Sequence, residues 1–213
     1  QPFQNREETL FCICNGEIYN HEELRVKHKL TCNTSSDCDV VYSLYEKYVN
    51  EKTLKTTDIN SLVESMISEL DGVYAFCIVD MREEQPRIVI ARDPFGVRSL
   101  YYANNVDTKE LYIASELKSI PKYMHQHTIN FPAGHYSING NIRKNTLVWC
   151  EEYYQMHAVN TTDIEHHQTN TFVQKAVKEC FEKAVNKRLM SDRPIGCLLS
   201  GGLDSSLVSA LVA

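Results

Sequence analysis

Short apolar runs along this chain predict strands, and apolar residues spaced three and four apart predict helices. Residues 11–14 and 74–79 predict strands, and residues 87–91 predict a third strand that returns after a polar hairpin connection over residues 80–86. Three further short strands are predicted over residues 100–103, 111–114 and 134–138. These elements predict a domain that is rich in antiparallel strands.

Apolar residues spaced three and four apart predict helices in the remaining segments. One helix begins after the Ser-Ser-Asp of residues 35–37, where Asp37 can be the N-cap, and a second covers residues 59–70 and is ended by Asp71-Gly72. A long amphipathic helix is predicted over residues 172–189, and we expect it to pack beside the strand that follows.

Residues 194–210 combine a short apolar run, a pair of glycines and a helix. Residues 195–199 predict a buried parallel strand, Ser-Gly-Gly allows a tight turn, and a helix follows from Ser205. Such a turn points backbone N–H groups outward at a helix N-terminus, which favours an anion. Hydroxyl donors at Ser200, Ser205 and Ser206 strengthen the prediction of a phosphate site, although the glycines alone also fit a plain turn.

A second candidate site follows directly on the first strand, at Asn15, Gly16 and Glu17. The Asn15 side-chain amide and the Gly16 backbone N–H can together stabilise the oxyanion of an acyl intermediate. Glu17 offers a carboxylate to an ammonium group. An Asn-Gly pair is also typical of a hairpin turn, and these residues alone leave that alternative open.

Composition excludes several classes of function. The chain has 213 residues, of which 43% are hydrophobic and 23% charged, and its net charge of −6 argues against a nucleic-acid surface. No apolar run approaches the ~20 residues of a membrane span. Eight cysteines without a C-x-x-C pair predict buried, reduced thiols in a cytosolic protein, and no metal-ligand spacing accompanies the histidines.

Six motifs in the first part of the chain resemble the glutamine amidotransferase domain of the N-terminal-nucleophile type. They are residues 15–20 (NGEIYN), 36–39 (SDCD), 70–76 (LDGVYAF), 92–98 (RDPFGVR), 115–118 (SELK) and 131–134 (FPAG). The resemblance implies an α+β sandwich with two sheets between helices. It also implies that Asn15 and Gly16 form the oxyanion hole for the attacked glutamine amide. Glu17 and Asp37 would hold the glutamine α-amino group.

The Ser-Gly-Gly loop resembles the pyrophosphate loop of the ATP pyrophosphatases, which adenylate a carboxylate or similar oxygen. The resemblance implies that the start of an α/β domain lies here. By this resemblance Leu199 would border the adenine, residues 200–206 would bind the pyrophosphate end of ATP, and Asp204 would help to place Mg²⁺. The loop residues concerned are Ser200, Gly201, Gly202, Leu203, Asp204, Ser205 and Ser206. No lysine follows the glycines, so the loop is not a Walker loop.

The two sets of motifs together resemble one family, the glutamine-hydrolysing asparagine synthetases. The resemblance implies a type-2 amidotransferase domain over residues 1–154, a polar connector over 155–170 and the beginning of a synthetase domain over 171–213. It implies synthesis of asparagine from aspartate through β-aspartyl-AMP, with ammonia from glutamine and with Mg²⁺-ATP. A homodimer without nucleic-acid or membrane partners is a further expectation.

The sequence also departs from this family. The family's nucleophile is an N-terminal cysteine, and Gln1, Cys12 and Cys14 cannot replace it, so we expect an inactive interior fragment. Arg92 and Asp93 would fix a loop between strands, with Ser99 where relatives commonly have proline. Two alternatives remain: a truncated, non-catalytic relative that acts as an interaction or regulatory domain, and an enzyme that resembles a β-lactam synthetase.

Overall fold

The computed structural model describes residues 1–145 and 169–213, which belong to two compact units, Gln1–Tyr153 (unit 1) and Tyr154–Ala213 (unit 2). The strands of unit 1 are β1 (Phe3–Gln4), β2 (Leu10–Ile18), β3 (Gly72–Asp80), β4 (Arg87–Arg92), β5 (Tyr101–Asn105), β6 (Glu110–Ala114), β7 (Thr128–Asn130), β8 (His135–Ile138) and β9 (Asn141–Lys144). Its helices are α1 (His21–His28), α2 (Asp39–Tyr48), α3 (Glu51–Leu54) and α4 (Ile59–Ser68), with the 3₁₀ segments η1 (Leu117–Ser119) and η2 (Lys122–His127). In the described ranges, no helix has the length and apolar character needed to cross a membrane.

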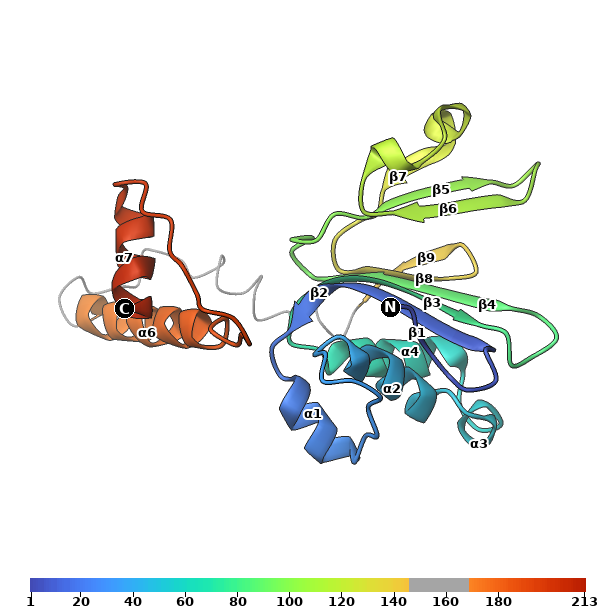
Figure 1. Ribbon diagram of the computed structural model, residues 1–213, viewed down its shortest axis with the longest axis horizontal. Coiled ribbons are helices and arrows are strands. Elements are labelled where there is room, and N and C mark those ends of the chain that lie inside the picture. Colours follow the sequence, from blue (N-terminus) through green and yellow to red (C-terminus); the bar gives the residue numbers. More distant parts are fainter. Residues whose placement is uncertain (146–168) are drawn as a thin grey trace. The chain divides into compact units, whose positions relative to one another are not determined.

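Six strands of unit 1 form an antiparallel sheet in the order β1-β2-β3-β4-β8-β9 (Figure 1). Strands β2 and β3 pair along their whole length, from Leu10 opposite Asp80 to Ile18 opposite Gly72. Because successive side chains of a strand point to opposite faces, the even-numbered residues of β2 and β3 share one face. The odd-numbered residues of both strands share the other.

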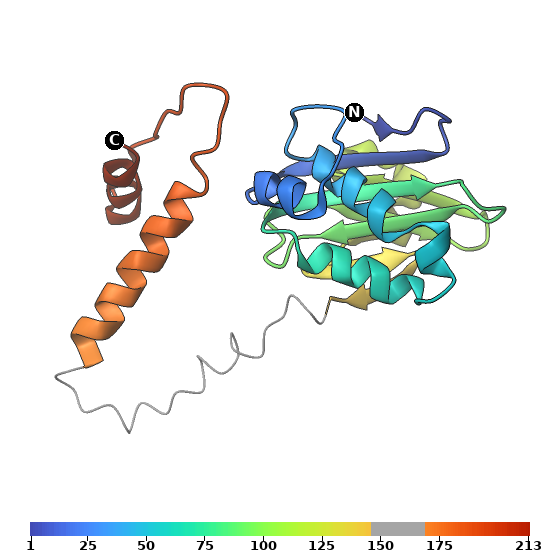
Figure 2. The same cartoon turned by 90° about the horizontal axis from the view of Figure 1, so that it is seen from below.

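Helices α1, α2 and α4 cover the even-numbered face of this sheet (Figure 2). The core there includes Cys12, Cys14, Tyr74 and Phe76 from the strands, together with Leu24, Leu44 and Met66 from the three helices. Helix α4 begins at an N-cap, Asp58, whose carboxylate accepts two backbone N–H groups of the first turn. Apolar burial therefore fixes the helices against one side of the sheet.

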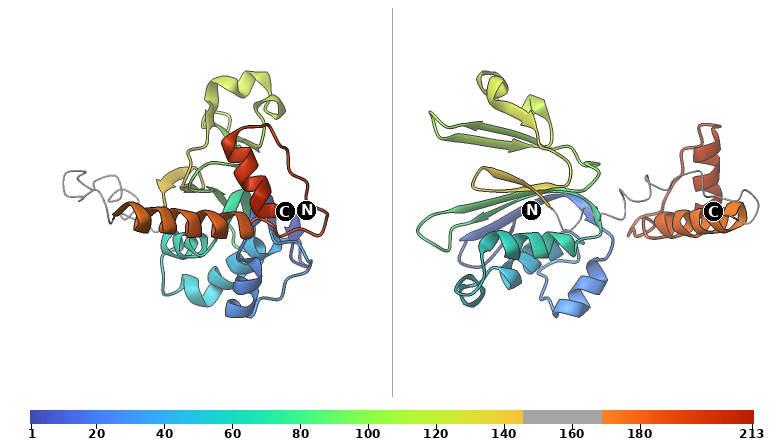
Figure 3. Two further views of the ribbon diagram at one scale, coloured as in Figure 1. Left: turned by 90° about the vertical axis from the view of Figure 1, so that its left-hand side faces the viewer. Right: turned by 180° about the vertical axis from the view of Figure 1, so that it is seen from behind.

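A three-stranded sheet in the order β6-β5-β7 packs on the odd-numbered face (Figure 3). The chain leaves the large sheet after β4, forms these three strands, and returns to the large sheet at β8. Between the sheets lie Ala75, Cys77, Ile90, Leu100, Tyr102 and Phe131, and Met124 of η2 packs on the outer side of the small sheet. This is the α+β sandwich that the sequence predicts.

Most predicted elements of unit 1 are confirmed within one or two residues, but three boundary assignments are wrong. The strand predicted over residues 11–14 continues to Ile18 as β2, so Asn15 and Gly16 lie within a strand and not in a hairpin turn. Asp37 does not cap α2, whose N-cap is Cys38, because the Asp37 carboxylate accepts a hydrogen bond from the Ile18 N–H at 2.7 Å. Helix α4 ends at Ser68, before Asp71-Gly72. Gly72 instead begins β3, where a Cβ atom would lie 2.3 Å from the Glu17 carbonyl oxygen.

Unit 2 contains α6 (Thr169–Asn186), which confirms the predicted long helix, and α7 (Leu203–Val212), which packs against it. The predicted strand over residues 195–199 is wrong, because these residues are exposed and form no strand. A strand needs a neighbour for its N–H and C=O groups, and the described part of unit 2 offers only two helices. The prediction that the long helix packs beside such a strand is therefore also wrong.

The predicted burial of the cysteines holds for only part of the chain. Cys12, Cys14, Cys38 and Cys77 are buried in unit 1, whereas Cys180 and Cys197 in unit 2 are exposed. All of the described cysteines are free thiols. Cys150 and most of the predicted connector 155–170 lie outside the described residues.

Candidate functional site

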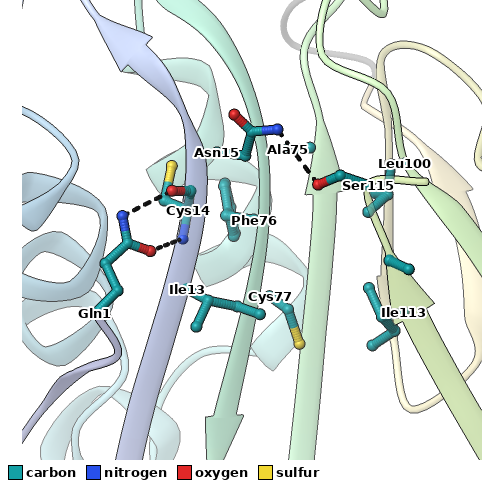
Figure 4. A pocket seen from close by; sticks show the side chains of 11 residues that line it. Gln1, Ile13, Cys14, Asn15, Ala75, Phe76, Cys77, Leu100, Ile113 and Ser115 are labelled. Carbon is teal, nitrogen blue, oxygen red and sulfur yellow. Dashed lines mark hydrogen bonds between the residues drawn. The ribbon is translucent and has the colours of Figure 1, made fainter. Parts of the chain in front are cut away.

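Asn15 lies on the odd-numbered face of β2, which looks toward the three-stranded sheet. Its Nδ2 donates a hydrogen bond to Ser115 Oγ at 3.3 Å, directly after the end of β6 (Figure 4). A cavity of about 150 Å³ opens beside the two side chains, and it is lined by Gln1, Ile13, Cys14, Asn15, Ala75, Phe76, Cys77, Leu100, Ile113, Ala114 and Ser115. A cavity of this volume accepts a group of a few non-hydrogen atoms, such as a carboxamide.

The Gly16 backbone N–H points to the edge of β2 that faces away from β3. Alternate N–H groups of a strand point the same way, and the amides on both sides of Gly16 show that direction. The Cys14 N–H donates to Gln1 Oε1 at 2.8 Å, and the Ile18 N–H donates to Asp37 Oδ2 at 2.7 Å. Among the described residues no acceptor reaches the Gly16 N–H, so it can donate to a ligand.

Close pairing of β2 with β3 explains why residue 16 is a glycine. A Cβ atom there would lie 2.4 Å from the Val73 carbonyl oxygen and 2.8 Å from the Tyr74 Cα. Both are backbone atoms of β3, so they cannot turn aside as a flexible side chain can. The glycine therefore allows the strands to approach closely where the candidate donors lie.

Glu17 forms an ion pair with Arg98, in which Nη2 donates to Oε1 at 2.9 Å. Arg98 ends a loop, residues 93–98, that is wound around the buried carboxylate of Asp93, which accepts three of the loop's backbone N–H groups. The Arg92 guanidinium donates to two carbonyl groups of the same loop. The predicted architectural role of Arg92 and Asp93 is confirmed.

Asp37 joins this group from the turn before α2. Its Oδ2 accepts the Ile18 N–H, and the Cys38 thiol lies 4.0 Å from the same oxygen. Because Cys38 Sγ also donates to the Gly16 carbonyl oxygen at 3.4 Å, the turn is held against the end of β2. The structure therefore brings the four predicted residues of unit 1 to one end of a single strand.

The cysteines beneath this site are unsuited to nucleophilic attack. Burial raises the pKa of the Cys12 thiol well above its usual value. A hydrogen bond with Cys38, together with burial, raises the pKa of the Cys14 thiol far above its usual value. A thiol must ionise to act as a nucleophile, so these thiols have a packing role at neutral pH.

The predicted phosphate loop of unit 2 is exposed and leads into α7. Gly201 has a φ of +84°, and no atom lies within 4 Å of a Cβ built on it. The hydroxyls of Ser200 and Ser205 lie 2.9 Å apart, and Ser206 Oγ donates to the Gly202 carbonyl oxygen at 2.8 Å.

The start of α7 leaves backbone donors available. Its first intrahelical bond runs from the Ser206 N–H to the Gly202 carbonyl oxygen, so the N–H groups of the first turn have no intrahelical acceptors. Asp204 lies in this turn, and the neighbouring Leu203 and Leu199 side chains are exposed. An anion at this position would meet the positive end of the helix dipole.

Sequence reasoning assigned no role to two side chains that contact the unit 1 site, Ser115 and Arg98. Both lie in motifs that carried the family resemblance, residues 115–118 and 92–98. A search for hydroxyl or cationic partners of Asn15 and Glu17 within those motifs would have found them. Their contacts depend on the packing of one sheet over the other, which local patterns do not specify.

Comparison with known proteins shows two family matches along the chain. A family model described as the glutamine amidotransferase domain matches residues 1–122, and one described as asparagine synthase matches residues 176–213. Asparagine synthetase [glutamine-hydrolyzing] 1 of Arabidopsis thaliana is 37% identical over 218 residues, which cover 100% of this chain and 32% of the relative. The nodule asparagine synthetase [glutamine-hydrolyzing] of Pisum sativum is 37% identical over 216 residues, with the same two coverages.

Two solved structures share the fold. Glutamine phosphoribosylpyrophosphate amidotransferase from B. subtilis, complexed with ADP and GMP, gives a TM-score of 0.50 at 22% identity and covers 67% of this chain and 30% of that chain. The structure of the allosteric regulatory enzyme of purine biosynthesis gives a TM-score of 0.51 at 21% identity and covers 68% of this chain and 31% of that chain. At such identities the likeness supports the fold alone, and it confirms the predicted amidotransferase sandwich.

The chain spans about a third of the length of the curated relatives that it matches. The amidotransferase match covers more than half of the chain and includes the whole end of β2, with Asn15, Gly16, Glu17 and Asp37. The chain therefore belongs to the glutamine amidotransferase domain family, with the glutamine-hydrolysing asparagine synthetases among its relatives.

Proposed function

We propose that unit 1 is the glutamine-hydrolysing half of the full-length protein, with Asn15 and Gly16 as the oxyanion donors. Attack on the glutamine side-chain amide places a negative charge on its oxygen, and two N–H donors at hydrogen-bond distance stabilise it. The Gly16 N–H and the Asn15 amide lie on consecutive residues at the end of β2. This assignment rests on the direction of the Gly16 N–H. The Cys14 and Ile18 N–H groups on either side of it point the same way and already have acceptors, whereas the Gly16 N–H can donate to a substrate.

Recognition of the substrate α-amino group would fall to Glu17 and Asp37. An ammonium group carries several donors and binds best where carboxylates surround it. Asp37 Oδ2 is occupied by the Ile18 N–H, so Oδ1 would accept from the substrate. Glu17 already faces a cation, Arg98, and the incoming ammonium would share its second oxygen.

Unit 2 would contribute the pyrophosphate end of an ATP site. Residues 200–206 offer a helix N-terminus, a glycine with positive φ and three hydroxyls, with Leu199 exposed beside them for the adenine. Asp204 fits Mg²⁺, which binds through one or two carboxylates and the substrate phosphates and neutralises part of the phosphate charge. The loop has no lysine, which suits release of the whole pyrophosphate.

The complete reaction that we propose is the ATP-dependent conversion of aspartate to asparagine. Aspartate would react with ATP to form β-aspartyl-AMP and release pyrophosphate. Ammonia released from glutamine would then attack β-aspartyl-AMP, which gives asparagine and releases AMP. Residues 1–154 would serve glutamine hydrolysis and residues 171–213 would begin the synthetase domain. The presence of both family matches on one chain supports the coupling of these two activities. A cytosolic homodimer belongs to the same proposal, and the free thiols agree with a reducing compartment.

The test uses the full-length protein with glutamine or ammonia as the nitrogen source. We expect glutamate release, and AMP and pyrophosphate in step with asparagine. Asn15→Ala should lower glutamine-dependent turnover by about 10²- to 10³-fold, as for loss of one oxyanion donor, and should leave ammonia-dependent synthesis intact. Equal loss with ammonia would place Asn15 outside the glutamine site.

Other products would refute other parts of the proposal. ADP and orthophosphate would exclude adenylation. A full-length protein with neither glutaminase nor synthetase activity would favour a non-catalytic, regulatory relative instead. The comparison of glutamine with ammonia separates the hydrolytic half from the synthetic half, because ammonia bypasses only the former.

A further inference from the structure

The orientation of the Asn15 amide depends on a residue outside β2. An asparagine amide turns easily about its terminal torsion, because torsions at a planar group have broad minima. Asn15 is exposed on the strand, so packing does not fix its side chain. Its Nδ2 instead donates to Ser115 Oγ at 3.3 Å, as Figure 4 shows.

Ser115 is itself held in place. It follows Ala114, the last residue of β6, which pairs with Tyr101 at the start of β5. Its carbonyl oxygen accepts a hydrogen bond from Ser99 Oγ at 2.7 Å, just before β5 begins. The Ser115 hydroxyl therefore projects from a fixed point of the three-stranded sheet toward the end of β2.

The amide group of Asn15 has two N–H donors. The hydrogen bond to Ser115 uses one of them and fixes the plane of the amide, which leaves the second in a defined direction for an oxyanion. An oxyanion donor is effective only when its direction is set before the reaction, since reorientation costs part of the stabilisation. Without the hydroxyl, the amide would occupy several orientations.

We propose that Ser115 is a positioning residue for glutamine hydrolysis, which acts by orienting the Asn15 amide. This inference rests on the proposed glutaminase function. Ser115 would act through Asn15, so its loss should affect turnover more than substrate affinity. A merely structural role would instead lower both activities and both substrate affinities together.

The experiment measures glutamine-dependent kcat and KM of the full-length protein with Ser115→Ala. We expect kcat to fall about fivefold to tenfold, the effect of one net hydrogen bond, with KM changed less than about twofold. Ser115→Thr keeps the hydroxyl and should restore kcat. Ser119→Ala, which removes an exposed hydroxyl from η1, is the matched control and should leave both parameters unchanged.

A double-mutant cycle then tests whether Ser115 acts through Asn15. In the Asn15→Ala background, Ser115→Ala should cause no further loss, because the donor that it orients is absent. Ammonia-dependent synthesis should stay at the wild-type rate in every variant, which also verifies folding.

Three results would overturn the inference while the proposed function stands. They are an unchanged kcat in Ser115→Ala, a full additional loss in the Asn15→Ala background, and an equal loss with ammonia. A wild-type protein that releases no glutamate from glutamine would refute the proposed function itself, and the role of Ser115 with it.

Discussion

Substitution of Gly16 by alanine tests the close pairing of β2 and β3 where the candidate oxyanion donors lie. The new Cβ would lie 2.4 Å from the Val73 carbonyl oxygen and 2.8 Å from the Tyr74 Cα, so the two strands must move apart. Overpacking of this kind costs about 1–3 kcal/mol, and we expect about 3 kcal/mol because the obstructing atoms belong to the backbone. For a unit of this size, that cost corresponds to a fall in Tm of about 10 °C.

The assay is urea unfolding of the chain, followed by far-UV circular dichroism. Gly196→Ala is the matched control, because a Cβ at that position meets no atom within 4 Å. It should change the free energy of unfolding by less than about 1 kcal/mol. A Gly16→Ala variant as stable as this control, with an unchanged m-value, would show that the two strands are not so closely paired at Gly16.

Asp80→Asn removes the charge that two arginines share at the buried end of β3 and should lower the free energy of unfolding by about 3 kcal/mol. Burial opposes the ionised form of Asp80, but hydrogen bonds with Arg82 outweigh this effect and lower the pKa of Asp80. The stabilisation is therefore present above the unfolded-state pKa and is lost as the pH falls. A stability difference between the wild type and Asp80→Asn that persists in strong acid would contradict this reasoning. Gly201→Val should abolish asparagine synthesis with either nitrogen source and spare glutamine hydrolysis, since a φ of +84° excludes a β-branched residue; retained synthesis would make the loop a plain turn. An alkylating reagent should modify Cys197 in the native chain and should modify Cys12 only after unfolding, because Cys12 is buried and burial raises the pKa of its thiol. Mass spectrometry measures both modifications. Rapid modification of Cys12 in the native chain would show that the core opens.

Strand and helix positions in unit 1 were predictable because their apolar residues report burial. The continuous apolar run of β3 reflects burial on both faces, and the three-and-four spacing of α4 reflects contact with one core. The prediction of a strand over residues 195–199 was wrong because apolar residues alone do not make a strand. Its apolar residues indicate burial, but a strand also requires a hydrogen-bonding neighbour, and periodicity does not show whether one is present.

The candidate residues of the unit 1 site could be proposed from the sequence because Asn15, Gly16 and Glu17 are consecutive. Local chemistry and the family resemblance together suggested the roles that we propose for them. The partners Ser115 and Arg98 lie about 80 to 100 positions further along the chain, and only the stacking of the two sheets brings them close. The use of Asp37 as an acceptor for the Ile18 N–H, rather than as a helix cap, has the same origin.

The two faces of β2 also constrain how the gene can change. Even positions such as Cys14 contribute to the core and odd positions such as Asn15 contribute to the site, so a single-codon deletion inside residues 10–18 would exchange the two sets at once. Single-residue deletions or insertions there should be lost from any selected library, although they keep the reading frame. The exposed connection between β3 and β4, residues 81–86, carries no such alternation and should accept changes in length.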